Sequence, residues 1–120
     1  MTRANQHLGA FGERMAAAYL KKKGYEILQN NFRCRLGEID IIAIHRNTYV
    51  FVEVKTRRSL DFGRPVEAIS EKKKRHMLNT AQSYLSMKRL LDTNFRFDAI
   101  EVFIEQERVK NIEHLENIIE

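Results

Sequence analysis

The sequence is short of the residues that cross-link a chain, break its helices or anchor it in a membrane. It has one cysteine, one proline, five glycines and no tryptophan among 120 residues. The single thiol, Cys34, excludes an internal disulfide and is typical of a protein in a reducing compartment. The longest aliphatic run, residues 41–44, is far shorter than the roughly 20 residues that a membrane-spanning helix needs. No cationic segment followed by an apolar one stands at the N-terminus, so we expect a cytoplasmic protein without a membrane partner.

Acidic residues are scarce except near the C-terminus. Residues 101–120 contain six glutamates against Arg108 and Lys110, a local net charge of −4 within an overall net charge of +5. Residues 1–100 therefore carry +9, from 19 basic and 10 acidic side chains. An excess of this size attracts polyanions such as nucleic acid. Charge alone leaves a solvated basic protein with no nucleic-acid partner equally open.

The rest of the composition is that of one small globular domain covering residues 1–120. Apolar residues make up 43% of the chain and charged residues 31%, which is ordinary for a globular protein. The chain is long enough for one domain and too short for two. Because it can bury a core of its own, neither a disulfide nor a structural metal is needed for folding.

Two helices are predicted from their end signals and apolar spacing. Residues 8–23 are rich in Ala, Leu and Met and end in three lysines before Gly24, which is typical of a helix C-terminus. The second helix covers about residues 71–91 and has Ser70 as its N-cap. Its apolar positions keep helical spacing; they are Met77, Ala81, Tyr84, Leu85 and Leu91.

Strands are predicted in the remaining apolar segments from their β-branched and aromatic residues. They cover residues 37–45, 48–56, 95–105 and 107–113, with a strand or an extended link at residues 25–33. The segment from Ser59 to Pro65 is predicted to be a loop. With helices available for both sides of a sheet, the expected class is a layered α/β fold.

Two acidic residues face each other in the hairpin predicted for residues 37–56. A two-residue turn at Arg46 and Asn47, or a four-residue loop over residues 45–48, gives the same register. That register sets Asp40 opposite Glu53, on one face of the sheet. In the same register Glu38 falls opposite Lys55.

The opposed carboxylates predict a metal site. They repel each other, and their Ile and Val neighbours limit their solvation, so burial of both charges is costly. A hard divalent cation such as Mg²⁺ would remove the conflict, because it binds one or two carboxylates together with waters and phosphate oxygens. Lys55 lies two residues beyond Glu53 and hence on the same face, within reach of an attacking water. These are the parts of metal-assisted phosphodiester hydrolysis.

A segment of the form E-x-K is by default an exposed pair on an edge strand. Here the run VFVEVK is apolar on both faces up to Glu53, which favours a central strand. The position of Asp40 opposite Glu53 weakens the default further.

At these residues the sequence resembles the PD-(D/E)XK nuclease superfamily, whose pattern is an acidic residue on a first helix, then Asp, then E-x-K on successive strands. The matching positions are Glu13, Asp40 and Glu53-Val54-Lys55. The sequence is still more similar to the YraN-like family of small bacterial proteins. The shared segments cover nearly the whole chain except its acidic C-terminus; they are GAFGE (9–13), YLKKKGY (19–25), NFR (31–33), GEIDIIA (37–43), VFVEVKTR (50–57) and RFD (96–98).

The resemblance implies a restriction-endonuclease-like three-layer fold, with a mixed central sheet flanked by helices. It implies a nuclease that uses Mg²⁺ or Mn²⁺ on nucleic acid, with DNA favoured over RNA, and it is compatible with a homodimer. Asp40 and Glu53 would hold the metal, and Lys55 would position the water. Glu13 would make a water-mediated or second-metal contact; otherwise it is a helix-surface residue or the partner of a lysine.

Basic residues around the E-x-K strand are candidates for contacts with nucleic-acid phosphates. Arg57, Arg58 and Arg64 follow the strand directly, and Arg is suited to bidentate phosphate contacts. Lys72 and Lys73 open the second helix, where cations oppose the helix dipole, so they are assigned to the same surface. A solvated helix face is the alternative for these lysines.

Three further residues have open assignments. Glu38 either pairs with Lys55 or lies in solvent at the strand end. Gln82 is a possible contact for the phosphate or the metal-bound water, whereas Tyr84, in the apolar stripe, is assigned to the core.

Three functions are compatible with these observations. The first is a metal-dependent nuclease acting on branched, nicked or single-stranded nucleic acid. The second is a non-catalytic module that uses a nuclease-like fold to bind nucleic acid. The third is a protein-interaction part that docks through the acidic C-terminus. A pure binder has no use for Asp40, Glu53 and Lys55 together, which favours the nuclease.

Overall fold

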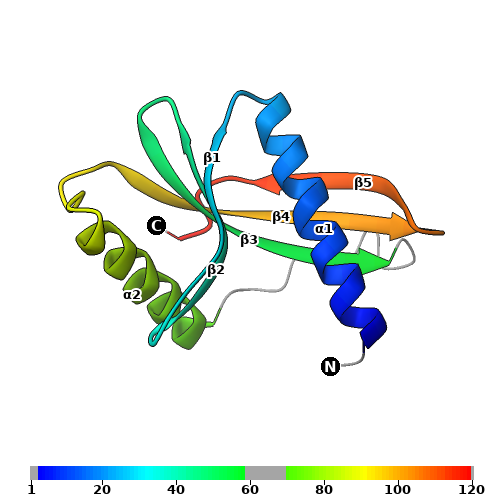
Figure 1. The fold of residues 1–120 in the computed structure, drawn as a ribbon, viewed down its shortest axis with the longest axis horizontal. Helices are drawn as coiled ribbons and strands as arrows, with labels where there is room; N and C mark the ends of the chain where they lie inside the picture. Colours follow the sequence, from blue (N-terminus) through cyan, green and yellow to red (C-terminus); the bar gives the residue numbers. More distant parts are fainter. Residues whose placement is uncertain (1–2, 59–69, 120) are drawn as a thin grey trace.

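The computed structural model describes residues 3–58 and 70–119, with side chains from His7 onward. Within these ranges a helix and three strands precede a second helix and two more strands (Figure 1). The elements are α1 (Arg3–Lys22), β1 (Glu26–Cys34), β2 (Gly37–His45), β3 (Thr48–Arg58), α2 (Glu71–Met87), β4 (Phe95–Glu105) and β5 (Arg108–Leu115). The predicted α/β class is confirmed. No helix in the described parts of the chain is both long and apolar enough to cross a membrane.

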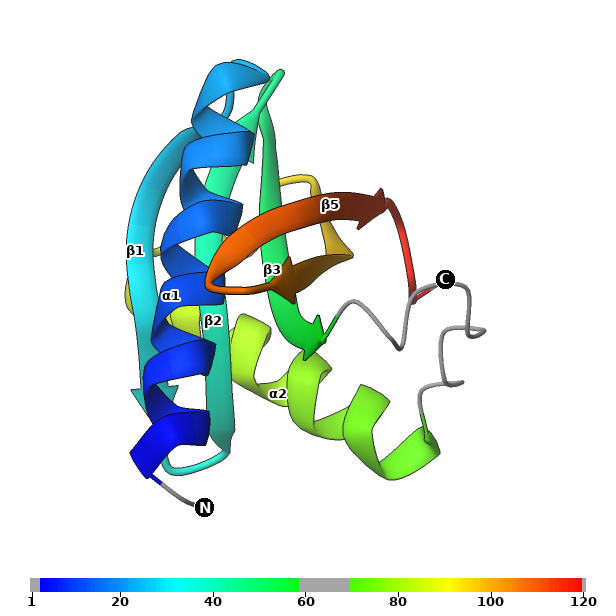
Figure 2. The same cartoon turned by 90° about the vertical axis from the view of Figure 1, so that its right-hand side faces the viewer.

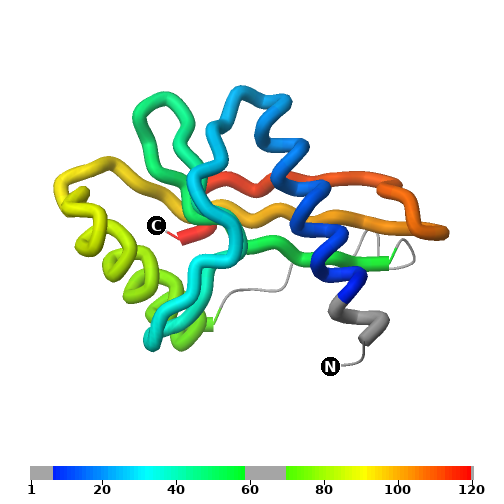
Figure 3. Tube along the Cα trace, in the orientation of Figure 1, coloured from blue at the N-terminus to red at the C-terminus, as the bar shows by residue number. Residues whose placement is uncertain are grey.

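The five strands form one mixed sheet in their order along the chain, β1-β2-β3-β4-β5. All neighbouring strands are antiparallel except β3 and β4, which are parallel. A parallel pair needs a long crossover connection, and α2 lies in the connection between β3 and β4, as the trace in Figure 3 shows. This mixed sheet with helices is consistent with the expected restriction-endonuclease-like fold.

The two helices cover opposite faces of the sheet and create two apolar layers (Figure 2). On the α1 face, Ala16 and Leu20 pack on Ile41, Val52 and other aliphatic side chains of β2 to β4. On the α2 face, the layer is richer in aromatic rings; it contains Phe32, Phe51, Met77, Tyr84, Leu85 and Phe97. β3 supplies both layers, which confirms that the strand with the E-x-K motif is central.

The C-terminus of α2 differs from the prediction. The helix ends at Met87 and not near residue 91, and Leu91 is 63% exposed instead of buried. The reason is a left-handed residue, Arg89, with φ of 59°. It turns the chain so that Leu90 donates a hydrogen bond to the Leu85 carbonyl over 2.7 Å and packs on the α2 face. Leu90 thus takes the place that the helical spacing assigns to Leu91.

A buried polar cluster fixes the C-terminal segment to the sheet. Asp98 on β4 is fully buried and accepts hydrogen bonds from Arg96, from His114 on β5 and from the Asn117 backbone N–H. His114 Nδ1 lies 3.0 Å from the Lys23 ammonium, which can only donate, so His114 Nε2–H donates to Asp98. The cluster joins the end of α1 and the last residues of the chain to the middle of β4.

Candidate active site

The β2–β3 hairpin forms as predicted as far as Ile41 and Val52. Arg46 and Asn47 have φ of 50° and 64°, as a two-residue type I′ turn requires. Residue 44 pairs with residue 49 and residue 42 with residue 51, which is the predicted register. The paired ladder ends one position before Asp40 and Glu53. Beyond it the Asp40 carboxylate replaces a backbone acceptor, because the Val54 N–H donates to Asp40 Oδ2 over 2.8 Å.

Asp40 is the carboxylate of the site whose pKa is raised most. Burial is the main cause that raises its pKa; the hydrogen bond from Val54 opposes it, the nearby carboxylates of Glu13, Glu53 and Glu38 add to it, and the net result is a pKa of about 6. Four acidic side chains from α1, β2 and β3 therefore act on one another. The sequence predicts the repulsion between Asp40 and Glu53 but not its extension to the first helix.

Glu53 lies in a small cavity next to Asp40. The cavity has a volume of about 140 Å³ and is lined by Glu38, Ile39, Asp40, Val52, Glu53, Lys73 and Met77. The Lys73 ammonium is 3.0 Å from Glu53 Oε1, and the Glu53 side chain is 17% exposed. Ser70 caps α2 by accepting from the Lys73 backbone N–H, so the first turn of the helix holds Lys73 over the cavity. Lys73, predicted as a phosphate contact, is thus within the carboxylate cluster itself.

Glu13 reaches the same cluster from α1. It is half-buried, and burial raises its pKa, opposed by a hydrogen bond to Asn31 and by the charge of Arg33. Gly12 explains how the helix comes so close: a Cβ there would lie 1.9 Å from Thr56 Oγ1 on β3. Any larger residue at position 12 would require Thr56 or α1 to shift. The close approach at Gly12 therefore places the carboxylate of Glu13 near Asp40.

Glu38 does not pair with Lys55. Its register partner is Arg33 on β1, and Arg33 Nε lies 3.1 Å from Glu38 Oε2, with the Glu38 side chain 62% exposed. The ladder between β2 and β3 ends at Ile41 and Val52, so the register does not extend to Glu38 and Lys55, and the second assignment, a residue in solvent at the strand end, is the one that holds. Glu38 is instead an exposed acidic residue at the rim of the cavity.

Lys55 and Arg57 point to the face of the sheet that carries Glu53. Both are half-buried, and Lys55 is directly beside Glu101 of β4. Arg57 Nε donates to Glu101 Oε2 over 2.6 Å, and the Glu101 side chain is only 4% exposed. The other oxygen, Glu101 Oε1, is buried with no hydrogen-bond partner in the described parts of the chain. Arg57 therefore has a buried carboxylate as its partner. This ion pair fixes the guanidinium next to Glu101, the residue of β4 that lies beside Lys55.

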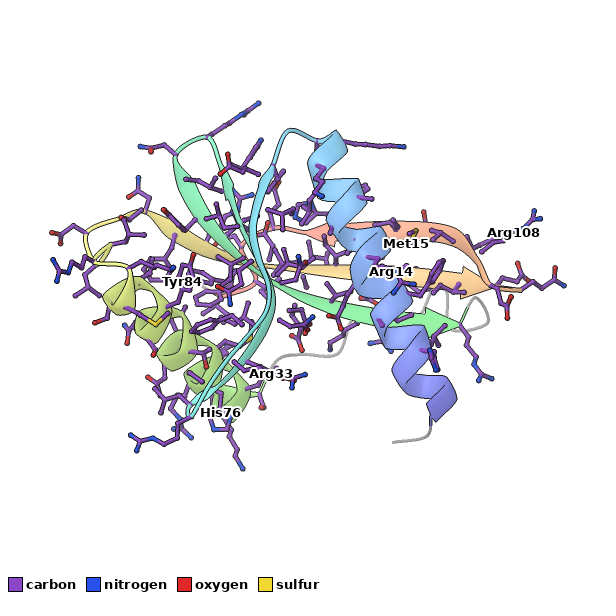
Figure 4. The ribbon with its side chains drawn as sticks, in the orientation of Figure 1. Arg14, Met15, Arg33, His76, Tyr84 and Arg108 are labelled. Carbon is purple, nitrogen blue, oxygen red and sulfur yellow. The ribbon has the colours of Figure 1, made fainter. Side chains whose placement is uncertain are left out.

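The remaining predicted residues lie outside the carboxylate cluster. Arg58 and Lys72 are exposed. Gln82 is exposed on α2 and is absent from the linings of the cavities that contain Asp40. Tyr84 is 4% exposed and packs edge-on against Phe32 and Phe51, which confirms its assignment to the core (Figure 4). Arg64 lies outside the described residues.

The donor set fits a hard divalent cation that completes its shell with water and phosphate. In the described part of the chain, no three His, Cys, Asp or Glu side chains are grouped so that they could hold a metal by themselves. Two carboxylate donors, Asp40 and Glu53, are what Mg²⁺ takes when substrate and water supply the rest. A cation between them would also offset the like charges that raise the pKa of Asp40. Zinc fits less well, because no His or Cys lines this cavity.

Sequence reasoning overlooked Asn31 and Glu101. Asn31 has φ of 53°, a conformation for which Asn is one of the preferred residues, and its side chain bonds Glu13. Glu101 stands between apolar residues, with Ala99 and Ile100 before it and residues 102–104 after it, and such a charge is rarely buried unless it is paired. The apolar surroundings of Glu101 are thus a signal that could have found it.

The comparisons with known proteins agree on one family. The sequence model described as "Uncharacterised protein family UPF0102" matches residues 12–102. A "UPF0102 protein" of Caldicellulosiruptor saccharolyticus is 52% identical over 88% of this chain and 87% of its own. Another, of Alkaliphilus oremlandii, is also 52% identical and covers 94% of this chain and 97% of its own. A third, "UPF0102 protein GSU0650" of Geobacter sulfurreducens, is 46% identical over 97% and 91% of the two chains.

Proposed function

Since the chain belongs to the uncharacterised protein family UPF0102 (YraN), we propose a function for it from its own site. The protein is a Mg²⁺- or Mn²⁺-dependent nuclease that hydrolyses phosphodiester bonds in DNA or RNA. The observation that carries the proposal is Asp40, a half-buried carboxylate: its burial and three neighbouring carboxylates together raise its pKa to about 6. A fold gains no stability from such an arrangement, whereas a cation site requires it.

Each residue of the cluster has a distinct task in this proposal. Asp40 and Glu53 would hold the metal, which would lower the pKa of a bound water and offset charge on the departing oxygen. Lys55, on the same face as Glu53, holds the attacking water by a hydrogen bond from its ammonium. Lys73 is 51% exposed and can turn from Glu53 to a phosphate oxygen of the substrate.

One contact supports the alternative, a nucleic-acid-binding module without catalysis. The ammonium of Lys73 already neutralises Glu53 at 3.0 Å, so one of the two carboxylates has a partner without any metal. Asp40 has no such partner among the described residues; it has only the Val54 N–H. The two functions therefore differ in whether a metal binds beside Asp40.

Cleavage assays with a panel of substrates test the proposal. Labelled linear, nicked, flapped and four-way DNA and matching RNA are incubated with Mg²⁺, Mn²⁺ or EDTA. We expect cleavage only with metal, and about a 10²-fold slower rate for Lys55→Ala, because the attacking water loses the group that positions it. Lys88→Ala, at the exposed C-cap of α2, is the matched control and should cleave at the parent rate. Salt-sensitive binding without cleavage by any of these proteins would contradict the nuclease and favour the binding module.

Metal affinity is expected to depend on pH through Asp40. With its pKa near 6, Asp40 is protonated below that pH, and a cation must displace the proton. The affinity for Mg²⁺ should therefore fall about ten-fold for each pH unit below 6 and level off above pH 7. Calorimetric titrations across this range measure it. An affinity that is flat between pH 5 and pH 8 would exclude Asp40 as a ligand.

A cytoplasmic location follows from the same proposal. Cys34 is a free thiol, which suits a reducing cytoplasm where nucleic acid is accessible.

A further inference from the structure

A second, larger cavity extends from Asp40 along α1 and β1. It has a volume of about 960 Å³, and we call it the α1–β1 groove. Glu13, Glu38 and Asp40 supply its acidic groups. On the α1 side its wall is made of small residues between cations, which lets a ligand approach the helix closely; the small residues are Gly9, Ala10, Ala17 and Ala18.

Two cations of α1 face the groove and are available to an anion. Arg14 and Lys21 are exposed and line it, and neither has an ion pair with a carboxylate in the described part of the chain. The third cation of the lining, Arg33, is neutralised by Glu38 at 3.1 Å. Arg14 and Lys21 are seven residues apart on the helix, which corresponds to about 10 Å along its axis. That length spans about three nucleotides of one B-form strand.

The groove offers contacts to a nucleic-acid backbone and no aromatic platform for bases. None of its lining residues is aromatic, so it cannot stack bases as single-strand binders do. Apart from its three carboxylates and the paired Arg33, its polar groups are the two cations and the amides of Asn30 and Asn31, the kinds of group that contact phosphates and sugars. A ligand in this groove is therefore recognised without regard to sequence.

We infer that the α1–β1 groove holds one strand of the nucleic acid by its sugar-phosphate backbone, with Arg14 and Lys21 on its phosphates and the scissile phosphate at Asp40. The nature of the ligand rests on the proposed function, while the path of the strand rests on the groove. The inference adds a binding surface on α1 to the one predicted around Arg57 and α2.

The salt dependence of DNA binding, measured in proteins that cannot cleave, tests the proposed path of the strand along the α1–β1 groove. All proteins carry Asp40→Asn, and the affinity for labelled DNA is measured by anisotropy at several salt concentrations in EDTA. Arg14→Gln/Lys21→Gln should lower the slope of log affinity against log salt by about 1.4 for single strands or about 1.8 for duplex. At about 0.1 M salt this corresponds to a loss of affinity of roughly 25- to 60-fold.

The matched control removes the same charge elsewhere. Lys22 is in the same last turn of α1 but does not line the groove, and Arg108 lies at the far end of the β4–β5 hairpin from Arg14 (Figure 4). Lys22→Gln/Arg108→Gln should change the slope by less than half as much. Equal losses in the two double variants would overturn the inference and indicate attraction by net charge alone.

The outcome separates the groove from the nuclease activity. If the parent protein cleaves and the groove variant binds like the control, the nuclease stands and the path of the strand is wrong. If the parent never cleaves but the groove variant alone loses affinity, the groove stands and the protein is a binding module. If the protein binds no nucleic acid at any salt concentration, both the groove and the proposed function are wrong.

Discussion

Asp40→Asn is expected to abolish metal-dependent cleavage and, at the same time, to stabilise the metal-free protein at pH 8. The substitution keeps the shape of the side chain, and the amide oxygen can still accept from the Val54 N–H. It removes one of the two carboxylates proposed to hold the metal. Losing about 4 kcal/mol of transition-state stabilisation corresponds to a rate about 10³-fold lower.

The gain in stability follows from the direction of the pKa shift. The folded protein raises the pKa of Asp40 from an ordinary value near 4 to about 6, so folding favours the protonated form. Its contribution to stability is fully present below pH 4 and is lost as the pH rises through 6. At pH 8 the parent therefore carries a penalty of about 1–3 kcal/mol, which the neutral Asn lacks. Urea unfolding in EDTA at pH 8 and pH 4 should show a gain at pH 8 only.

A matched control isolates the site from general effects of charge. Glu26→Gln, at the exposed start of β1, makes the same chemical change away from the cluster and should alter neither the rate nor the stability by much. If Asp40→Asn only disturbed the fold, both its cleavage rate and its free energy of unfolding at pH 8 would fall. An Asp40→Asn protein that cleaves as fast as the parent would contradict the assignment of the metal site.

The hairpin could be predicted because its determinants are local. The turn at Arg46 and Asn47 fixes the register, and the apolar residues on both faces of β3 mark it as central. The limit of the prediction is also local. Nothing in the sequence near Ile41 indicates that the pairing of β2 with β3 ends there. Because it ends there, Glu38 has no partner on β3 and forms its ion pair with Arg33 on β1.

Contacts between distant elements could not be derived in this way. The sequence predicts Lys73 in the first turn of a helix, but its position over Glu53 depends on how α2 docks on the sheet. The position of Glu13 beside Asp40 depends likewise on the close approach of Gly12 to Thr56. For Glu13 only the resemblance to a nuclease superfamily pointed to the site. Such contacts arise from packing, which helical or strand periodicity does not encode.

Loss of Asp98, which is not one of the residues proposed for the chemistry, is expected to have the largest effect on stability. Its carboxylate is fully buried and accepts from Arg96, His114 and the Asn117 N–H. Asp98→Ala leaves these three donors without their acceptor, and breaking a buried pair in this way costs about 3–5 kcal/mol. Because small domains are stable by only about 5–15 kcal/mol, much of the protein could unfold. Asp98→Asn, which keeps one acceptor oxygen, should lose less.

The pH dependence distinguishes this carboxylate from Asp40. Burial works to raise the pKa of Asp98, but the hydrogen bonds from His114, Arg96 and Asn117 outweigh it and hold the pKa below its ordinary value. Its contribution is therefore present above about pH 4, the ordinary Asp range, and is lost as the pH falls through the lowered pKa. Asp98→Ala should lose this acid sensitivity, whereas Asp92→Ala, at an exposed aspartate before β4, should keep it. Urea unfolding between pH 3 and pH 7 measures both variants. A loss below about 1 kcal/mol in Asp98→Ala would mean that solvent replaces the cluster and that the C-terminal segment is held by its apolar contacts.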